Sequence, residues 1–410
     1  MNTLTPEMLS SYRRRIEDDL RNNIIPFWKE RTLDYENGGY FGALTNDLTQ
    51  DNDAPRSAVV AARILWTFSA AYRAYREPAV LAAARHAYAY LVGPLWDAQH
   101  GGVYWQVDRL GKPVDDRKHV YAQAFAIYGL TEYFRATGDL QSRTLAHNLF
   151  HLVEAHSFDL AHGGNIECLS REWGSLEDMR LSPHEPHCRK SMNTLLHLME
   201  AYTNLLRAWP DPMVKERQAG LIANFLEHVI DPQTGHFHLF FDDAWHSLDN
   251  TVSFGHDIEG AWLLEEAAEV QGDHILMARA RKAALRMAAA VLAEGRDADG
   301  SVFYEGDFSQ PESRNKHWWG QAEGMVGFYA AYQLSKREEF GRAALQCWDV
   351  IEAHFIDREH GDWFKVLDRD GAPLPDQLKV GPWECPYHHA RACLEMIRRL
   401  DATLAAHSEH

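Results

Sequence analysis

Hydrophobic residues along this 410-residue chain recur every three to four positions in long segments, which is the spacing of buried α-helices. Segments such as ARILWTFSAAY and LLHLMEAYTNLL show the pattern clearly. It predicts helices that begin near Ser57, Val120, Ser191, Ser253, His317 and Pro386. Further helical segments cover residues 78–96, 140–156, 273–293 and 338–356. The pattern therefore predicts an all-α protein whose helices come in pairs.

One turn signal occurs six times between these segments, as NGGY, HGGV, HGGN, TGHF, DGSV and HGDW. A short aromatic or β-branched stretch, a polar loop and a long helix follow each one. A period of about 65 residues is longer than that of open solenoids, so six helical hairpins fit a closed ring better. We predict an (α/α)6 barrel with short β-hairpins in the loops at one end. An open superhelical scaffold for protein partners is the alternative.

The composition excludes several classes of protein. The chain has 59 acidic and 41 basic residues, and its net charge of −18 disfavours binding to nucleic acid or anionic membranes. Arg13, Arg14 and Arg15 form a short basic run, which we interpret as the solvated face of a first helix. The N-terminus lacks an apolar core and no apolar run is long enough to span a bilayer, so we expect a cytoplasmic protein. No Pro/Ser-rich linker divides residues 1–410, which favours a single domain.

Cysteine usage and motif searches narrow the chemistry further. The five cysteines include no C-x-x-C pair, which predicts reduced thiols without disulfides or a zinc knuckle. His236 and His238 alternate on a predicted strand, where surface placement is favoured over a metal site. His184 and His187 belong to a Pro-rich loop that is placed to line a pocket rim. The chain contains no G-x-G-x-x-G, P-loop or G-x-S-x-G motif, which disfavours nicotinamide, phosphoryl-transfer and serine-hydrolase chemistry.

Unusual polar and aromatic residues open the second helix of each repeat. Because equivalent positions in a ring of helices face one end of the barrel, these residues are predicted to converge in one polar, aromatic-walled pocket of the size of a sugar. They are Arg63, Tyr121, Gln123, Asn193, His197, His256, Glu259, Trp318, Trp319, Gln321, Glu323, His388 and His389. Each has an ordinary structural explanation as well: a lone histidine is often a hydrogen-bonded core residue, Arg63 fits a buried ion pair, and the tryptophans fit core packing.

Six blocks of sequence resemble one known family over essentially the whole chain. They are AARILWTFSAAYR, RKHVYAQAFAIYGL, KSMNTLLHLMEAY, VSFGHDIEGAWLL, HWWGQAEGMVGF and PYHHARACLE. Their order and content are similar to the N-acylglucosamine 2-epimerase superfamily and, within it, to the cellobiose 2-epimerases. The resemblance implies an (α/α)6 barrel that interconverts a reducing-end glucose with mannose, usually in a β-1,4-linked disaccharide, without an added cofactor.

The resemblance also implies roles for particular residues. It identifies His256 and His388 as the general acid/base pair. It assigns the holding or orienting of the sugar to Arg63, Tyr121, Asn193, His197, Glu259, Trp319, Glu323 and Trp383. The chain departs from the family in two places: His184-Glu185 replaces a common Lys-Asp pair, and His389 replaces an Asn. The first departure leaves the preference for a disaccharide over free mannose or glucose open.

The chemistry of C2 epimerisation suits such a histidine pair. A proton is removed from C2 of the ring-opened sugar and one is returned to the opposite face, and imidazole performs both steps near neutral pH. Arg63 and His197 are candidates to stabilise the intervening cis-enediolate, and Glu259, one turn after His256, is a candidate to orient an imidazole.

Several alternatives use related sites. D-mannose isomerase or mannose 2-epimerase activity on the free monosaccharide comes first, followed by N-acylglucosamine 2-epimerase. A glycoside hydrolase would employ Glu259 and Glu323 as its two carboxylates, and a silent carbohydrate-binding protein would need no histidine pair. We expect a small-molecule sugar as the ligand, neither nucleic acid, membrane, metal nor cofactor, and a monomer or homodimer.

Overall fold

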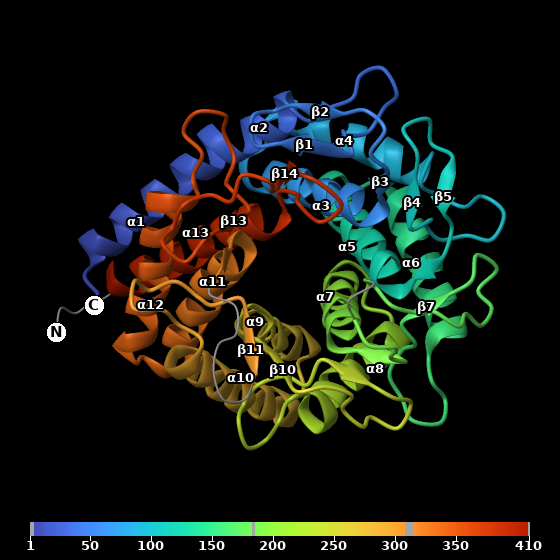
Figure 1. Ribbon diagram of the computed structural model, residues 1–410. Helices are drawn as coiled ribbons and strands as arrows, with labels where there is room; N and C mark the ends of the chain where they lie inside the picture. The colour runs from blue at the N-terminus through green and yellow to red at the C-terminus, as the bar shows by residue number, and fades with distance from the viewer. Residues whose placement is uncertain (1–3, 183–184, 308–314, 409–410) are drawn as a thin grey trace.

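Six long helices form the inner wall of a closed ring (Figure 1). The computed structural model describes residues 4–182, 185–307 and 315–408. Each inner helix starts within one residue of its predicted position, and almost every side chain in its first three turns is buried. The inner helices are α3 (Ala58–Tyr75), α5 (Val120–Thr137), α7 (Met192–Ala208), α9 (Phe254–Gln271), α11 (Trp318–Ser335) and α13 (Tyr387–Ser408). The (α/α)6 barrel is thereby confirmed.

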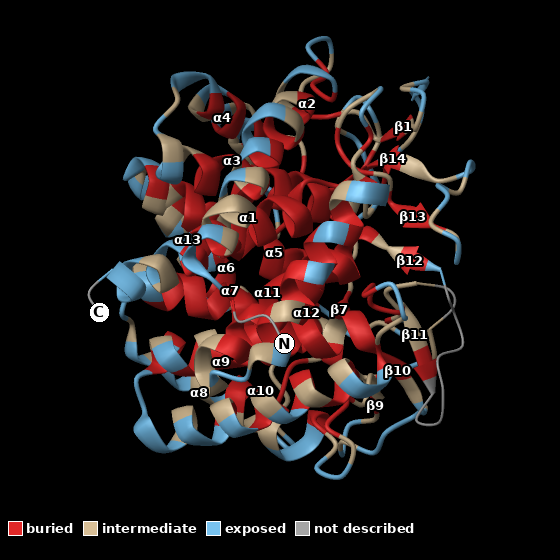
Figure 2. Ribbon diagram, turned by 90° about the vertical axis from the view of Figure 1, so that its left-hand side faces the viewer, coloured by how far each residue is buried: buried red, intermediate tan, exposed pale blue. Residues whose placement is uncertain are grey.

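An outer layer of helices surrounds this ring and presents a polar face to solvent, as the exposed segments in Figure 2 show. Three of the outer helices continue into a π-helical turn. The outer layer consists of α1 (Pro6–Asp19) with η1 (Leu20–Ile24) and α2 (Ile25–Glu30), α4 (Pro78–Val92), α6 (Leu140–Ser157), α8 (Pro212–Asn224) with η2 (Phe225–Val229), α10 (His274–Glu294), and α12 (Glu338–Val350) with η3 (Ile351–Phe355). No described helix is long and apolar enough to cross a bilayer.

Short antiparallel strands gather at one end of the ring (Figure 2). They are β1 (Ala43–Thr45), β2 (Gln50–Asp51), β3 (Arg56–Ser57), β4 (Gln106–Val107), β5 (Pro113–Asp115), β6 (Lys118–His119), β7 (Cys168–Leu169), β8 (Lys190–Ser191), β9 (Phe240–Phe241), β10 (Thr251–Ser253), β11 (Glu305–Asp307), β12 (Lys316–His317), β13 (Val366–Leu367) and β14 (Leu378–Val380).

The sequence predicted short β-hairpins in the loops at one end, and most of the strands also pair between consecutive repeats. The strand that leads into one inner helix pairs with the loop of the next repeat, as β6 does with β7 and β8 with β9. The last repeat returns to the first through β14 and β1. Hairpins within one loop are formed by β1 with β2 and by β4 with β5. The loops therefore hold neighbouring repeats together at this end.

The glycine turns are fixed by contacts to the next inner helix. Gly102 has a φ of 73°, and a Cβ there would lie 2.7 Å from Gln123 Oε1 and 2.8 Å from the Trp173 ring. Gln123 uses that oxygen to accept from Val103 N at 2.8 Å and donates Nε2 to Val103 O at 2.8 Å. Glycine is required here because its backbone reaches the left-handed region and because the neighbouring side chains leave no room for a Cβ.

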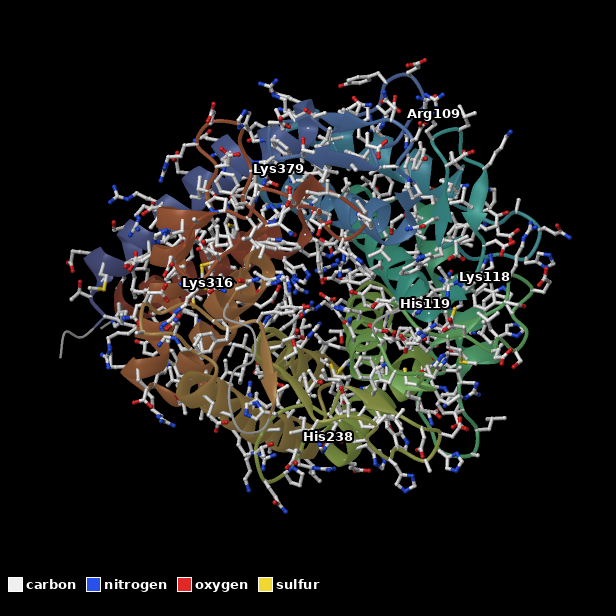
Figure 3. All side chains as sticks on the ribbon, viewed as in Figure 1. Arg109, Lys118, His119, His238, Lys316 and Lys379 are labelled. Carbon is white, nitrogen blue, oxygen red and sulfur yellow. The ribbon has the colours of Figure 1, made fainter. Side chains whose placement is uncertain are left out.

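A buried ion pair recurs beneath the same turns. Asp97 accepts from the backbone of its own turn and from Lys118 Nζ at 3.0 Å, and both side chains are fully buried. Lys379 bonds the buried Asp357 in the equivalent way, and Lys316 bonds Asp299, a more exposed residue of its own turn. Figure 3 shows these three lysines spread around the ring. In these repeats a buried lysine therefore bonds an aspartate of the turn, in addition to the turn signal itself.

The structure corrects the interpretation of the histidines at 236 and 238. These residues flank an isolated bridge at Phe237 and not a regular strand. His236 is buried, because Asp257 at 2.7 Å and Glu294 at 3.2 Å supply partners for its two ring nitrogens. Surface placement was therefore wrong for His236. His238 is partly exposed and lies near Asp231.

Candidate active site

A cavity of about 350 Å³ opens where the inner helices begin, at the strand end of the ring. The first two turns of all six inner helices supply its floor, and loops supply the rim. Helix N-termini carry partial positive charge, so this end of the barrel favours negative charge that develops on a ligand. The cavity is lined by Arg63, Tyr121, Leu181, Ser182, Glu185, Asn193, His197, His256, Tyr304, His317, Trp318, Trp319, Trp383, Glu384 and His388.

Eight of the ten residues that the sequence proposed for the site line this cavity, together with Trp318. Glu259 and Glu323 lie behind the wall, where both bond Arg391. Three other helix-start residues are directed elsewhere, which corrects the prediction that all would converge. Gln123 and Gln321 clamp the backbone of Val103 and Val302, and His389 bonds Asp362 at 2.7 Å. Of the Pro-rich loop, His184 is outside the described residues and His187 is exposed.

His388 is held by a carboxylate on the neighbouring helix. Its Nδ1 lies 2.8 Å from Glu323 Oε1, which also accepts from Arg391 at 2.7 Å. Glu323 Oε2 accepts from Trp262 Nε1 at 3.0 Å. Arg391 and Trp262 can only donate, so Glu323 acts as an acceptor throughout and His388 donates from Nδ1. The Nε2 of His388 is therefore unprotonated in the neutral ring.

His256 has a different partner and a different neighbour. Its Nδ1 lies 2.7 Å from Ser253 Oγ, a neutral hydroxyl. Its ring centre lies 4.6 Å from that of Trp319, and the ring centre of His388 lies 5.6 Å from the same tryptophan. Glu259, a candidate to orient an imidazole, has its Oε1 3.9 Å from His388 Nδ1. The two histidines thus share a tryptophan neighbour but differ in the group that supports each of them.

A third histidine and an arginine complete the floor. His197 Nδ1 bonds Glu200 Oε2 at 3.0 Å, so its Nδ1 is also the donor. Arg63 donates to Tyr121 Oη at 2.7 Å, and its guanidinium stacks 4.2 Å from the Phe125 ring centre. The sequence offered a buried ion pair as the structural explanation of Arg63. Among the described residues its hydrogen-bond partner is instead a phenol, that of Tyr121. Arg63 lines the cavity, and its Nε is buried without a hydrogen-bond partner in the part of the chain that the structure describes.

Burial controls the ionisation of these groups. It lowers the pKa of His256 to about 3 and of His197 to about 4, and it holds the pKa of His388 well below the ordinary value. Burial alone would raise the pKa of Glu200, but the charge of Arg391 outweighs this effect and the pKa of Glu200 is lowered to about 2. The three imidazoles are therefore neutral in the empty cavity at neutral pH, and each is available as a base.

Aromatic surfaces form the remaining wall. Trp383 lies 5.9 Å from both Trp105 and Tyr121 by ring centres. Tyr304 stacks on His317 at 3.9 Å on the other side of the rim. Aromatic faces of this kind pack on the C–H surface of pyranose rings, and the intervening polar groups are placed for hydroxyls.

Sequence reasoning missed several residues of the site. Arg391, Glu200 and Ser253 were not identified as partners of the histidines, and the loop residues Tyr304 and Glu384 were not identified as lining. A signal was present for two of them: a charged residue follows three positions after His197 and after His388, one turn along the same helix. The loop residues carry no comparable periodic signal.

One group of side chains has the composition of a metal site. Ligand atoms of Glu259, Glu323 and His388 lie within 4.8 Å of one another. Arg391 already bonds both carboxylates, at 2.6 and 2.7 Å. A cation there would have to displace the guanidinium, so the donor set fits an arginine better than a metal ion.

Known proteins are similar to this chain in sequence and in fold. The model of the N-acylglucosamine 2-epimerase family matches residues 39–392. A cellobiose 2-epimerase of Bacteroides fragilis is 42% identical, over 94% of this chain and 98% of its own length. The solved structure of cellobiose 2-epimerase from Bacillus thermoamylovorans B4167 has a TM-score of 0.91 at 40% identity and covers 95% of this chain and all of its own.

A more distant structure shares the fold alone. A D-mannose isomerase superimposes with a TM-score of 0.81 at 23% identity, covering 94% of this chain and 97% of that one. Barrels of the same shape therefore carry more than one sugar activity, and the side chains of the cavity must discriminate between these activities.

Proposed function

We propose that this protein epimerises a sugar at C2, and the basis is that the chain belongs to the N-acylglucosamine 2-epimerase family. It is a carbohydrate epimerase and therefore an isomerase. The substrate that we propose is a reducing-end glucose, as in cellobiose, which is converted to the corresponding mannose sugar. The names of the relatives, at 42% and 40% identity over nearly the whole chain, support this substrate.

The observation that carries the proposal is the histidine pair. His256 and His388 lie on α9 and α13, line one cavity and both lie next to the ring of Trp319. Each has its Nδ1 engaged by a partner behind the wall, Ser253 in one case and Glu323 in the other. Such an arrangement leaves Nε2 of both rings for a bound sugar, as acid/base chemistry on opposite faces of C2 requires.

The reaction begins when the sugar ring opens and exposes the C1 aldehyde. One histidine then removes the C2 proton through Nε2, and the electron pair of the C–H bond moves to give a cis-enediolate. The other histidine, in its protonated form, returns a proton to C2 from the opposite face. The pair therefore holds one proton more than two neutral imidazoles in the reacting state, and the two exchange roles in the reverse direction.

Arg63 and His197 are proposed to stabilise the enediolate. Arg63 is 3% exposed, and Tyr121 accepts one of its hydrogen bonds without neutralising the guanidinium. Donors that are already in place when negative charge develops contribute most to such a step, and loss of one typically lowers kcat by about 100-fold or more. The positive ends of the inner helices add to the same effect.

The rim supports a disaccharide more than a free monosaccharide. Ser182, Glu185, Tyr304 and Glu384 extend the cavity beyond the helix ends that hold the two histidines. Trp383, between Trp105 and Tyr121, offers an aromatic face at that level. Free mannose, epimerised or isomerised to fructose, stays the second candidate, because the fold of a D-mannose isomerase is similar and the floor would serve either reaction.

Hydrolysis of a glycoside is less well supported. That chemistry needs two carboxylates on either side of the scissile bond. Glu259 and Glu323 are both bound by the single guanidinium of Arg391 behind the cavity wall. Their position suits the support of a histidine and not direct attack on a sugar.

Product analysis tests the proposed reaction. Purified protein is incubated separately with cellobiose and with mannose, and the products are resolved by chromatography and NMR. We expect cellobiose to give 4-O-β-glucosyl-mannose, with a higher kcat/KM than any reaction of mannose. Fructose as the main product from mannose, with cellobiose unchanged, would replace this proposal by the isomerase.

We further propose that the reaction needs no cofactor, because Arg391 fills the place that a metal ion would take. Extensive dialysis against EDTA is expected to change kcat by less than about twofold, whereas loss of a catalytic metal would abolish the several kcal/mol of transition-state stabilisation that it supplies. Activity that disappears on dialysis and returns with one added metal ion would contradict this.

The cellular setting and assembly are also proposals. Five buried, unpaired cysteines support a reducing compartment such as the cytoplasm. The whole of residues 1–410 is proposed to act as a single catalytic domain, as a monomer or homodimer. Sedimentation analysis distinguishes these two states.

A further inference from the structure

Three buried carboxylates from three inner helices meet one guanidinium behind the cavity. Arg391 Nη1 bonds Glu200 Oε1. Its Nη2 donates to Glu259 Oε1 at 2.6 Å and to Glu323 Oε1 at 2.7 Å. The guanidinium packs 4.3 Å from the Tyr387 ring centre and 4.9 Å from that of Trp262, and it is 1% exposed.

Two of these carboxylates each hold a histidine of the cavity. Glu323 Oε1 accepts from His388 Nδ1 at 2.8 Å, and Glu200 Oε2 accepts from His197 Nδ1 at 3.0 Å. The phenol of Tyr387 also donates to Glu200, at 2.6 Å to Oε2. One arginine therefore stands at the centre of two carboxylate–histidine pairs that reach the cavity from different helices.

The charges of this cluster make the arginine indispensable. In the described part of the chain, Arg391 is the only arginine or lysine that pairs with Glu200, Glu259 or Glu323. Burial, together with the charge of Glu323, raises the pKa of Glu259, which relieves part of the excess negative charge. Unpaired buried carboxylates would otherwise take up protons, and a protonated carboxyl no longer fixes the tautomer of the histidine beside it.

We infer that Arg391 is a positioning residue, which keeps Glu323 and Glu200 as acceptors and thereby holds His388 and His197 in the tautomer that presents an unprotonated Nε2 to the cavity. The role of His388 as a catalytic base rests on the proposed function, whereas the tautomers themselves do not. A guanidinium suits the task because its planar fork reaches three carboxylates at once, while an ammonium cannot reproduce that geometry.

The inference predicts that the two histidines are coupled. Loss of the charge on one carboxylate changes how strongly Arg391 binds the other, so the effects of Glu200→Gln and Glu323→Gln should not be independent. The combined loss of kcat is expected to differ from the product of the single losses by more than about twofold. In an Arg391→Lys background the same two losses should simply multiply.

The first experiment replaces Arg391 by lysine and reads both catalysis and tautomers. We expect kcat to fall about 10- to 100-fold with KM changed less than about threefold, as is typical when a partner behind an active group is lost. Long-range ¹⁵N–¹H spectra of ¹⁵N-histidine-labelled, ligand-free protein should lose the Nδ1-protonated pattern of His388 and His197. Signals are assigned from the His197→Gln and His388→Gln variants.

A matched control lies on the same helix. Arg399 is two turns further along α13, is 7% exposed and pairs with Glu395 and Gln333 at the far end of the barrel. Arg399→Lys should leave the histidine spectra and kcat unchanged, with a comparable melting temperature. An equal loss of kcat in this control, or unchanged histidine spectra in Arg391→Lys, would overturn the inference.

The spectra also separate this inference from the proposed function. A wild-type protein that epimerises no sugar would reject the proposed function, while the tautomers of the ligand-free protein still test Arg391. If Arg391→Lys fails to fold, Glu323→Gln supplies the readout. This substitution should alter the His388 signals strongly. It should also alter the His197 signals, and this second effect can reach His197 only through Arg391. Signals of His197 that are identical to wild type would count against the inference.

Discussion

At the scale of single residues, the two histidines of the proposed pair differ in the group behind them. A carboxylate, Glu323, bonds His388, whereas a hydroxyl, Ser253, bonds His256. A carboxylate stabilises the imidazolium that forms when the ring takes up a proton, and a hydroxyl does so only weakly. Charge on the pair is therefore stabilised more at His388 than at His256.

Substitution of the two partners tests this difference. Glu323→Gln keeps the shape but removes the charge, and we expect kcat to fall about 10- to 100-fold. Ser253→Ala removes a neutral bond that contributes about 1 kcal/mol, so a loss of less than about tenfold is expected. Steady-state kinetics on both variants, with melting temperatures as the control, give the comparison. Equal losses would show that the charge of Glu323 is unimportant.

The pH dependence of the reaction follows from the buried imidazoles. Burial lowers the pKa of His256 to about 3 and that of His388 well below its usual value of about 6.5. The proposed reaction needs one neutral and one protonated imidazole, and the lowered pKa values make the protonated form scarce at neutral pH. The share of enzyme with one proton on the pair grows as the pH falls, so kcat/KM should rise between pH 6.5 and pH 5. Rate profiles over the range in which circular dichroism shows folded protein test this. A kcat/KM that falls as the pH drops from 6.5 to 5 would contradict it.

The sequence located these side chains better than it located their partners. Eight of the ten proposed residues line the cavity because they occupy one register of six equivalent helices. Arg391 was missed because its three carboxylate partners come from α7, α9 and α11, and contacts between distant helices leave no trace in local spacing. For the same reason the sequence did not show which imidazole Glu259 would approach: its Oε1 lies 3.9 Å from Nδ1 of His388 on α13.

At the scale of the elements, buried glutamines connect each glycine turn to the helix that follows. Gln321 on α11 accepts from Val302 N and donates to Val302 O, both at 2.8 Å, as Gln123 on α5 does with Val103. These are residues that the sequence placed in the pocket. Their polar groups bond a buried backbone instead, because buried N–H and C=O groups need hydrogen-bond partners.

Removal of one such clamp should cost stability and not chemistry. Gln321→Ala leaves a buried N–H and C=O without partners, at a cost of about 1–3 kcal/mol each. We expect a lower melting temperature, with kcat of the folded protein changed less than about threefold. Thermal unfolding and kinetics at 25 °C measure the two effects. Selective loss of kcat at an unchanged melting temperature would indicate that Gln321 acts in the reaction and not in folding.

Helix positions were predictable and strand pairing was not. Apolar residues at a spacing of three to four fix where α3, α5 and the other inner helices begin, whatever surrounds them. Strands of two or three residues carry no alternation to identify their partners. The pairing of β6 with β7 joins different repeats and follows from how the helices are arranged in the ring.

At the scale of the whole molecule, closure of the ring depends on contacts between its two ends. Strand β14 pairs with β1 at the loop end, and α1 packs against α13, the helix that carries His388. Arg13 bonds Asp401, so part of the basic run is an ion pair between the ends and not simply a solvated face. Ile16 is fully buried on the inner side of α1.

Two neighbouring positions on α1 compare packing with charge. Ile16→Ala should lower the free energy of unfolding by about 2–5 kcal/mol, because it empties space between α1 and the ring. Arg14, exposed on the same helix, should tolerate alanine within about 0.5 kcal/mol. Thermal unfolding of both variants tests the contribution of α1. Equal melting temperatures would mean that α1 does not help to close the ring.

The closed ring itself could be predicted because its cause is repeated six times in the sequence. A period of about 65 residues, with two helices in each, leaves few arrangements that bury every apolar face. The shape of the cavity could not be predicted, because its rim is made by loops of different lengths, such as those that carry Glu185 and Tyr304.

The central claim is that two histidines exchange protons on opposite faces of C2, and deuterium incorporation tests it most directly. Cellobiose and glucosyl-mannose are incubated separately in D₂O with wild-type protein, His256→Asn and His388→Asn. With wild-type protein we expect deuterium at C2 of both sugars. Each variant should label only one of the two sugars, because its remaining histidine serves only one face of C2. The sugar that His256→Asn labels should be the one that His388→Asn leaves unlabelled. Epimerisation without deuterium, or a variant that labels both sugars like wild type, would contradict it.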